Sequence, residues 1–208
     1  MSEEEAERLV CQDVPRETCE RLKAFINLLR DEAEKQNLIA RSTLDQIWQR
    51  HILDSSQLLG PTKDAAGPWV DIGSGAGLPG LVIAILRDQP CLLIEPRAKR
   101  AAFLSEAIER LGLASRVTVI AQTAASAPAV TAAVISARAV APLPRLFAIG
   151  ARFADAETIW VLPKGRSAAE ELASARASWQ GEFRLVPSLT DSCAAIVVAR
   201  GVRPRKTR

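Results

Sequence analysis

Residues 69–86 read WVDIGSGAGLPGLVIAIL, and this stretch decides the fold of the chain. A short apolar strand runs into a glycine-rich turn and then into an apolar helix, the unit from which open α/β sheets are built. The turn contains two overlapping motifs. Gly75, Gly77 and Gly80 form G-x-G-x-x-G, whereas Gly73, Gly75 and Gly77 form G-x-G-x-G. These motifs indicate different ligands, and the end of the strand distinguishes them.

The nicotinamide and flavin fingerprint begins directly after its strand and places its third glycine in the first turn of the helix. Here the strand runs straight into Gly73, so that third glycine would fall at Leu78. The match at Gly75–Gly80 begins too late and contains Pro79, which we expect at the first helical position. The turn therefore favours a backbone lying close to an uncharged or zwitterionic ligand over a pyrophosphate cradle, and it argues against a nicotinamide-dependent oxidoreductase.

Two acidic residues accompany the turn. Asp71 is the penultimate residue of the strand, where it either faces the ligand or caps the turn. Glu95 ends the next expected strand, where a carboxylate can accept two hydrogen bonds from a ribose diol. Both cofactor classes contain such a diol, so Glu95 by itself does not discriminate between them.

Outward from this stretch, the pattern predicts two N-terminal helices followed by an alternating α/β region. Residues 16–36 present Leu22, Phe25, Ile26 and Leu29 at helical spacing. Residues 42–59 follow, with Ser42 as the expected cap and Asp45 as its capping-box partner. A Gly- and Pro-rich linker covers residues 60–68. Further short strands are expected at 91–95, 117–120, 133–136 and 158–162, with helices between them.

The last two expected strands, residues 183–189 and 194–200, are separated by only four residues, TDSC. A connection this short cannot hold a helical crossover, so these strands should run antiparallel. The sequence thus predicts an α/β fold with a seven-stranded, mostly parallel sheet in which the last strand is reversed. We expect an N-terminal helical segment at 1–66 packed on a domain at 67–202, and a basic tail at 203–208.

Bulk properties narrow the functional classes. The chain has 208 residues, 48% apolar and 25% charged, with no Tyr, so aromatic stacking is not the expected device for binding nucleic acid. The net charge is only +3, and four of the last six residues are Lys or Arg, which suits a phosphate-binding arm or a solvated terminus. The four cysteines lack metal-ligand spacing, so free thiols in a reducing cytoplasm, and no metal, are expected. The chain shows neither a signal peptide nor a membrane-length apolar run.

The glycine register, Glu95 and the reversed last strand resemble the class I S-adenosylmethionine-dependent methyltransferases, which have a Rossmann-like fold. The resemblance extends to a narrower family through NLIA, IWQRHILDS, DIGSGAGLPGLVIAI, KRAAFL, VISARAVAPL and LPKG, which occur in this order. Between about Asn37 and Gly165 the chain resembles the bacterial 16S ribosomal RNA guanine-N7 methyltransferases, also called the glucose-inhibited division protein B family. The elements IWQRHILDS and GLPG are the most specific.

The resemblance implies roles for matching residues. S-adenosylmethionine would be bound by Gly73, Gly75, Gly77, Leu78, Glu95, Ala124, Ala125 and Arg138. Glu95 would bind the ribose diol, the two alanines would lie beside the adenine, and Arg138 would stand between cofactor and target. The candidates for binding 16S ribosomal RNA, or the small ribosomal subunit, are Arg50, His51, Lys164 and Arg166. The chain departs from many relatives in having Ala125 and Ala133 where they have acidic residues.

The chemistry implied by the resemblance requires no general base, because guanine N7 carries a free in-plane lone pair. Proximity and alignment are then the main demands on the protein. Arg138 is the candidate positioning residue, although it could instead form a structural salt bridge. His51 could be an interface histidine bonded to Asp54 or to the backbone. Two other functions remain open: methylation of another RNA, a protein or a small molecule, and RNA binding as a non-catalytic assembly factor.

Overall fold

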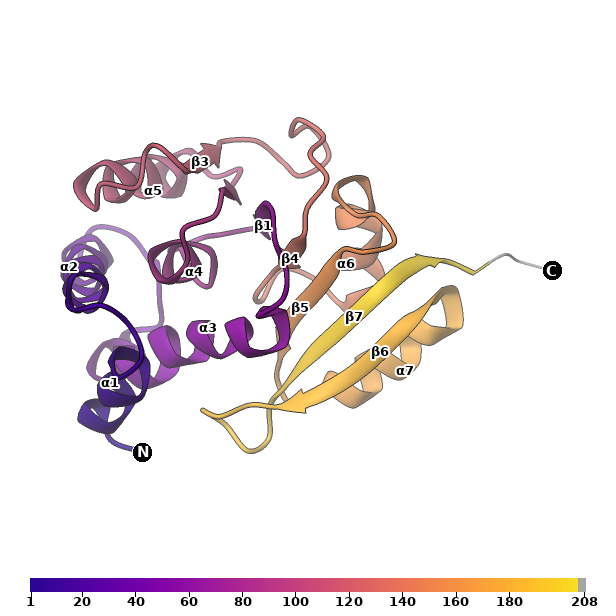
Figure 1. Ribbon diagram of the computed structural model, residues 1–208, viewed down its shortest axis with the longest axis horizontal. Helices are drawn as coiled ribbons and strands as arrows, with labels where there is room; N and C mark the ends of the chain where they lie inside the picture. The colour runs from indigo at the N-terminus through magenta and orange to yellow at the C-terminus, as the bar shows by residue number, and fades with distance from the viewer. Residues whose placement is uncertain (206–208) are drawn as a thin grey trace.

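The computed structural model describes residues 1–205 and contains a seven-stranded sheet flanked by helices on both faces (Figure 1). The strand order is β3-β2-β1-β4-β5-β7-β6. The strands are β1 (Trp69–Ile72), β2 (Cys91–Ile94), β3 (Val117–Ile120), β4 (Val134–Ser136), β5 (Ile159–Lys164), β6 (Trp179–Pro187) and β7 (Ala195–Pro204). All the pairs among β1 to β5 are parallel, whereas β7 is antiparallel to both β5 and β6. The predicted fold and the reversed last strand are confirmed.

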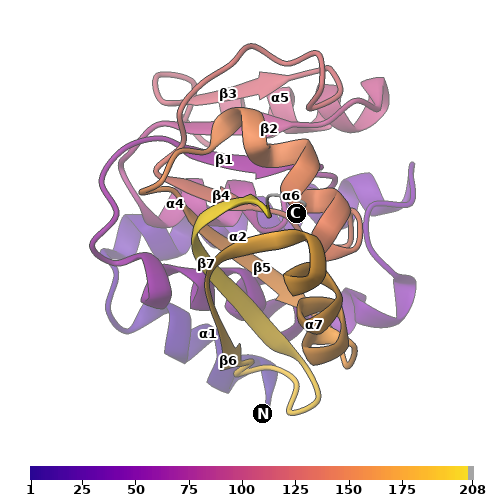
Figure 2. The ribbon, with the colours of Figure 1, turned by 90° about the vertical axis from the view of Figure 1, so that its right-hand side faces the viewer.

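The order in which the chain adds parallel strands reverses at β1, because the chain moves outward to β2 and β3 and then returns to β4 on the other side of β1. In open α/β sheets, this change of direction opens a crevice at the carboxyl ends of the strands, where ligands bind. The long β6–β7 hairpin extends the sheet on the far side and lies beside α7 (Ala168–Ser178; Figure 2).

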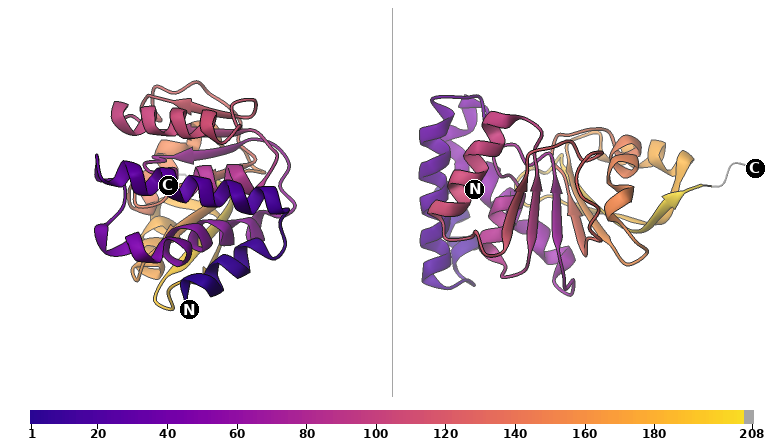
Figure 3. Two further views of the ribbon diagram at one scale, coloured as in Figure 1. Left: turned by 90° about the vertical axis from the view of Figure 1, so that its left-hand side faces the viewer. Right: turned by 90° about the horizontal axis from the view of Figure 1, so that it is seen from above.

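The helices divide into two sets, one on each face of the sheet (Figure 3). One face carries α1 (Glu3–Cys11), α2 (Arg16–Ala33), α4 (Gly80–Leu86) and α5 (Ala98–Arg110), and the other carries α6 (Leu143–Gly150) and α7. The predicted apolar face of α2 is buried, since Leu22, Phe25, Ile26 and Leu29 are at most 3% exposed. The N-terminal helices and α4 share one hydrophobic cluster, so the N-terminal segment is part of the main core.

The second predicted helix is present, but not as one regular α-helix. It comprises 3-10 turns η1 (Arg41–Gln46), π-helical η2 (Trp48–Leu53), α3 (Asp54–Ser56) and 3-10 turns η3 (Gln57–Thr62), so it extends into the predicted linker. The prediction that Ser42 caps it was wrong, because Ala40 occupies the cap position of η1 and no side chain bonds there. Instead, Glu3 accepts hydrogen bonds from the backbone N–H groups of Trp48 and Gln49, both at 2.9 Å.

The glycine turn joins β1 to α4 as expected, although Pro79 is the N-cap residue of α4 and not its first helical residue. Asp71 is fully buried behind the turn, and its Oδ2 accepts a hydrogen bond from the Gly80 N–H at 3.2 Å. Its Oδ1 accepts a hydrogen bond from the Ser136 hydroxyl at 2.6 Å. Burial raises the pKa of Asp71, and these hydrogen bonds to the carboxylate oppose that shift. Of the two expectations for Asp71, the structure therefore supports the cap.

Other expectations need correction. Cys11 and Cys19 form a disulfide between α1 and α2, where free thiols were expected, because the turn between these helices brings their Cα atoms to 5.5 Å. The segment 121–133 between β3 and β4 contains turns and no helix. Strand β7 continues to Pro204, and the Arg205 N–H donates to the Ser178 carbonyl, so the predicted tail from 203 begins inside the sheet. Residues 206–208 of that tail lie outside the described part of the chain.

Within residues 1–205, every helix is too short or too polar to span a bilayer. The same residues contain no group of three or more His, Cys, Asp or Glu side chains placed to hold a metal ion.

Candidate active site

A cavity of about 340 Å³ lies at the glycine turn, within the size range of small-molecule sites. Of the residues predicted to bind the cofactor, Gly73, Gly75, Leu78, Glu95 and Arg138 line it. The remaining lining residues are Leu38, Ser74, Ala76, Pro96, Arg97, Arg100, Ala139 and Val140. The parallel strands β1, β2 and β4 thus bring together side chains that lie far apart in the sequence.

The turn around this cavity depends on glycine backbone conformations. Gly73 and Gly75 have φ of +72° and +56°, in the left-handed region that side chains rarely adopt. Glu95 directly follows β2, which ends one residue earlier than expected, and it is 3% exposed. Its Oε2 accepts from the Gly75 N–H at 2.9 Å, and its Oε1 accepts from the Arg97 N–H at 2.8 Å. Glu95 therefore fixes the shape of the turn.

These residues fit a cofactor with a ribose and a zwitterionic tail. A carboxylate offers about four acceptor positions, so Glu95 retains lone pairs for a diol after accepting the two backbone hydrogen bonds. A Cβ added to Gly75 would lie 3.7 Å from the guanidinium of Arg100, which is also a lining residue, so the missing side chain leaves room on the cavity side.

Three residues predicted to bind the cofactor lie elsewhere. Gly77 faces the protein interior, where an added Cβ would lie 2.9 Å from Leu81 and 3.2 Å from Leu104. Ala124 is buried and Ala125 is exposed in the turn after β3, and the carbonyls of both accept hydrogen bonds from Arg152. None of these three lines the cavity. The assignment of an adenine site to Ala124 and Ala125 stays a prediction.

A second, larger cavity of about 730 Å³ adjoins the first. The two cavities share Leu38, Arg138, Ala139 and Val140 as lining residues. Val140 is 39% exposed and Ala139 has a left-handed backbone with φ of 56°. The segment that follows β4 therefore forms the boundary between the cavities, and Arg138 is the charged residue on that boundary.

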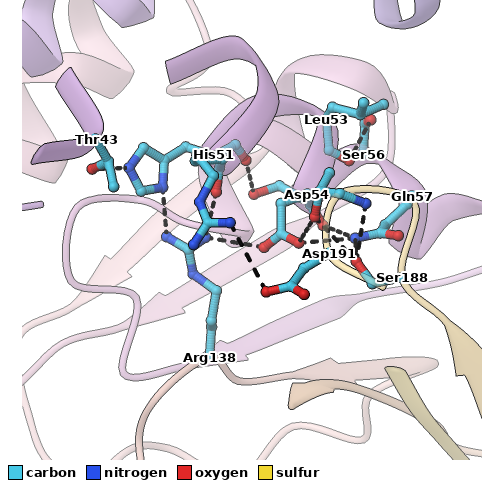
Figure 4. Close-up of polar contacts among 12 residues, drawn as sticks. Thr43, His51, Leu53, Asp54, Ser56, Gln57, Arg138, Ser188 and Asp191 are labelled. Atoms are coloured by element: carbon cyan, nitrogen blue, oxygen red, sulfur yellow. Dashed lines mark hydrogen bonds and ion pairs between the residues drawn. The ribbon is translucent and has the colours of Figure 1, made fainter. Parts of the chain in front are cut away.

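The larger cavity brings together most of the basic residues predicted from the sequence, and Figure 4 shows two of them, His51 and Arg138, side by side. Arg50, His51 and Lys164 line it, whereas Arg166 is exposed in the turn after β5 and is not a lining residue. Each lining cation has an acidic partner from another element, which the sequence patterns did not reveal. The ion pairs are Arg138–Asp54 at 3.2 Å, Lys164–Glu171 at 2.9 Å and Arg50–Asp191 at 4.0 Å.

His51 is held as a neutral side chain between two partners. It is 8% exposed, its Nδ1 lies 3.4 Å from the Arg138 guanidinium, and its Nε2 lies 2.8 Å from the Thr43 hydroxyl. A guanidinium only donates, so Nδ1 accepts and Nε2 carries the proton. The Thr43 hydroxyl in turn donates to the Ala40 carbonyl at 2.7 Å. The expected partners, Asp54 or the backbone, were wrong for this side chain, because Arg138 lies between His51 and Asp54.

This arrangement predicts a pH-dependent stability. Burial, followed by the charges of Arg138 and Arg50, lowers the pKa of His51 from 6.5 to about 4. Between these values the unfolded chain binds a proton that the folded chain does not, so this pKa shift increasingly destabilises the folded chain as the pH falls from 6.5 to 4. The shift corresponds to about 3 kcal/mol. Urea unfolding of the wild type and of His51→Gln across this range should show the steeper loss in the wild type. Equal slopes would contradict the neutral histidine.

Solved structures with a similar fold include a methyltransferase from Geobacter sulfurreducens, with a TM-score of 0.59 and 11% identity, covering 85% of this chain and 88% of that chain. A variant of MtNAS in complex with S-adenosylmethionine has a TM-score of 0.59 and 16% identity, covering 87% of this chain and 74% of that chain. The fold is that of the class I S-adenosylmethionine-dependent methyltransferases.

Sequence comparison identifies the family. A family model described as GidB, rRNA small subunit methyltransferase G, matches residues 18–195. The protein named ribosomal RNA small subunit methyltransferase G in Rhizorhabdus wittichii is 49% identical, over 99% of this chain and 95% of that protein. The protein of the same name in Erythrobacter litoralis is 44% identical, over 96% of this chain and 97% of that protein. The chain belongs to the GidB family of methyltransferases, which confirms the predicted family and enzyme class and supports S-adenosylmethionine as the cofactor.

Proposed function

We propose that this chain transfers a methyl group from S-adenosylmethionine to N7 of a guanine in 16S ribosomal RNA, working on the RNA or the small ribosomal subunit in the cytoplasm. The observation that carries the proposal is the pair of adjoining cavities that share Arg138, Ala139 and Val140. One has a glycine turn and the carboxylate of Glu95, which can accept hydrogen bonds from a diol, and the other is large enough for a nucleotide. Membership of the family supports the choice of RNA.

The cofactor, when bound, supplies an electrophilic methyl group. Gly73, Gly75 and Leu78 would bind it at the turn, and Glu95 would accept hydrogen bonds from its ribose. These residues and the cavity boundary provide proximity and alignment, which are the main contributions that a protein can make when the nucleophile needs no activation.

The polar groups of the larger cavity suit an acceptor that loses no proton. The carboxylates of Asp54 and Glu171 are ion-paired, and Glu171 also accepts hydrogen bonds from the Leu143 N–H and the Ser167 hydroxyl. Both ring nitrogens of His51 have partners. Guanine N7 has no proton to remove, so this cavity can serve it without a general base. Arg138, on the boundary between the cavities, would donate to the O6 of the base, to a phosphate or to the cofactor carboxylate.

The proposal is tested by transfer of labelled methyl groups. Small subunits, or their RNA, from a strain lacking this protein should accept label from S-adenosylmethionine, and mapping should locate it at N7 of one guanine. RNA from the wild-type strain should accept almost none, because its site is already modified. If the purified protein binds S-adenosylmethionine but labels neither substrate, the proposal is wrong, and a different methyl acceptor or an assembly role takes its place.

A further inference from the structure

The carboxylate of Asp54 joins three segments that lie far apart in the sequence (Figure 4). Its Oδ2 accepts a hydrogen bond from Arg138 Nη1, at the end of β4, at 3.2 Å. Its Oδ1 accepts hydrogen bonds from the Thr190 hydroxyl at 2.8 Å and from Gln57 Nε2 at 2.9 Å. The Asp54 side chain is only 18% exposed, so these bonds are largely shielded from solvent.

Thr190 belongs to the β6–β7 connection, residues 188–194, which docks against the turns around Asp54 through polar contacts. The Leu189 N–H donates to Gln57 Oε1 at 2.9 Å, and Gln57 Nε2 donates to the Ser188 hydroxyl at 3.3 Å. The side chain of Leu189, in contrast, is 64% exposed and adds little apolar burial. The position of the connection therefore depends on Asp54 and Gln57.

The same connection forms part of the wall of the larger cavity, through Ser188, Thr190, Asp191 and Ala194. Asp54 thus bonds Arg138, on the boundary between the cavities, with one oxygen. With the other oxygen it bonds Thr190, in the wall of the larger cavity. We propose that Asp54 is a positioning residue that holds both Arg138 and the β6–β7 connection in place. Its hydrogen bond to Thr190 then determines the affinity for the nucleic acid that enters the larger cavity. This inference rests on the proposed function, because it assigns that cavity to the RNA.

The effect of Asp54 on Arg138 and its effect on the β6–β7 connection can be tested separately, because each involves a different carboxylate oxygen. Thr190→Val removes the hydroxyl that bonds Oδ1, keeps a β-branched side chain and leaves the Arg138 ion pair in place. Losing a hydrogen bond to a charged group corresponds to about a tenfold change in an equilibrium constant. We therefore expect Thr190→Val to raise KM for undermethylated small-subunit RNA about tenfold, with kcat within about twofold and the affinity for S-adenosylmethionine unchanged. Thr190→Ser keeps the hydroxyl and should match the wild type. Asp54→Asn should lower kcat as well, because it removes the charge that orients Arg138.

Hydrogen–deuterium exchange gives a readout that does not need activity. The amides of Leu189 and Thr190 should exchange faster in Thr190→Val than in the wild type, and Thr190→Ser should again match the wild type. If Thr190→Val has a wild-type KM, or changes kcat and KM in parallel, the role in affinity is wrong. If exchange is unchanged, the positioning by Asp54 is wrong. A wild-type protein that transfers no methyl group refutes the proposed function, whereas faster exchange in Thr190→Val alone would still support the positioning.

Discussion

Arg138→Ala is expected to lower the rate of methyl transfer to undermethylated 16S ribosomal RNA at least about 100-fold, while the protein stays folded. Removing one positioned donor from an active site has an effect of this size. Arg138 is the charged residue that lines both cavities, and its side chain is 22% exposed. Alanine leaves Asp54 without its cation and leaves His51 Nδ1 without a donor. Initial rates with labelled cofactor measure the loss.

Two further variants serve as controls for this result. Arg138→Lys keeps the charge without the planar fork, so an intermediate rate is expected. Arg110→Ala removes an exposed i,i+4 ion pair with Glu106 on α5, away from both cavities, and should leave the rate unchanged. Circular dichroism and thermal unfolding should show a folded Arg138→Ala protein. Transfer by this variant at a rate close to that of the wild type would show that Arg138 has only the structural salt bridge as its role.

Much of the fold follows from local patterns in the sequence. The strands are short apolar runs, and the faces of α2 and α5 repeat at helical spacing, so burial on one side is encoded residue by residue. The glycine turn is equally local, because its backbone conformations require residues without a Cβ at Gly73 and Gly75. Counting from the end of β1 therefore locates the smaller cavity, proposed to bind the cofactor, from the order of the residues alone.

The larger cavity, proposed to bind the RNA, could not be predicted in the same way, because it depends on long-range pairing. Asp54 and Thr190 are 136 residues apart, and Arg138 and His51 are 87 residues apart. The sequence identifies Arg50 and Lys164 as candidate cations. Their partners Asp191 and Glu171 depend on how the β6–β7 connection and α7 pack against the other elements. The only local signal was Asp54 itself, which lies one helical turn after Arg50 in the motif IWQRHILDS.

Gly80→Ala is expected to lower the free energy of unfolding by about 3 kcal/mol, the upper part of the usual range for overpacking. An added Cβ would lie 2.5 Å from Leu93 Cδ2, 2.6 Å from Asp71 Oδ2 and 2.7 Å from Asp71 Cβ. Leu93 and Asp71 are both fully buried on central strands, so neither can move away without disturbing the sheet. Urea unfolding followed by circular dichroism measures the change.

Gly60→Ala is the matched control, because a Cβ at Gly60 would meet nothing within 4 Å and Gly60 has no left-handed backbone. That variant should change stability by less than about 0.5 kcal/mol. A loss of similar size in both variants would show that chain flexibility, and not contact with Leu93 and Asp71, explains the result for Gly80.

The glycines from the end of β1 to the start of α4 therefore differ in the neighbours that an added side chain would meet. At Gly73 an added Cβ would lie 2.6 Å from a methyl group of Val140, which is 39% exposed and free to turn toward solvent. Gly73→Ala should then act through its backbone conformation at the cavity and weaken cofactor affinity more than stability, because φ is +72°. At Gly80 the same substitution meets buried strands and should act on stability first. Gly80 completes a dinucleotide-like motif in the sequence, but its lack of a side chain serves the packing of α4 against β1 and β2.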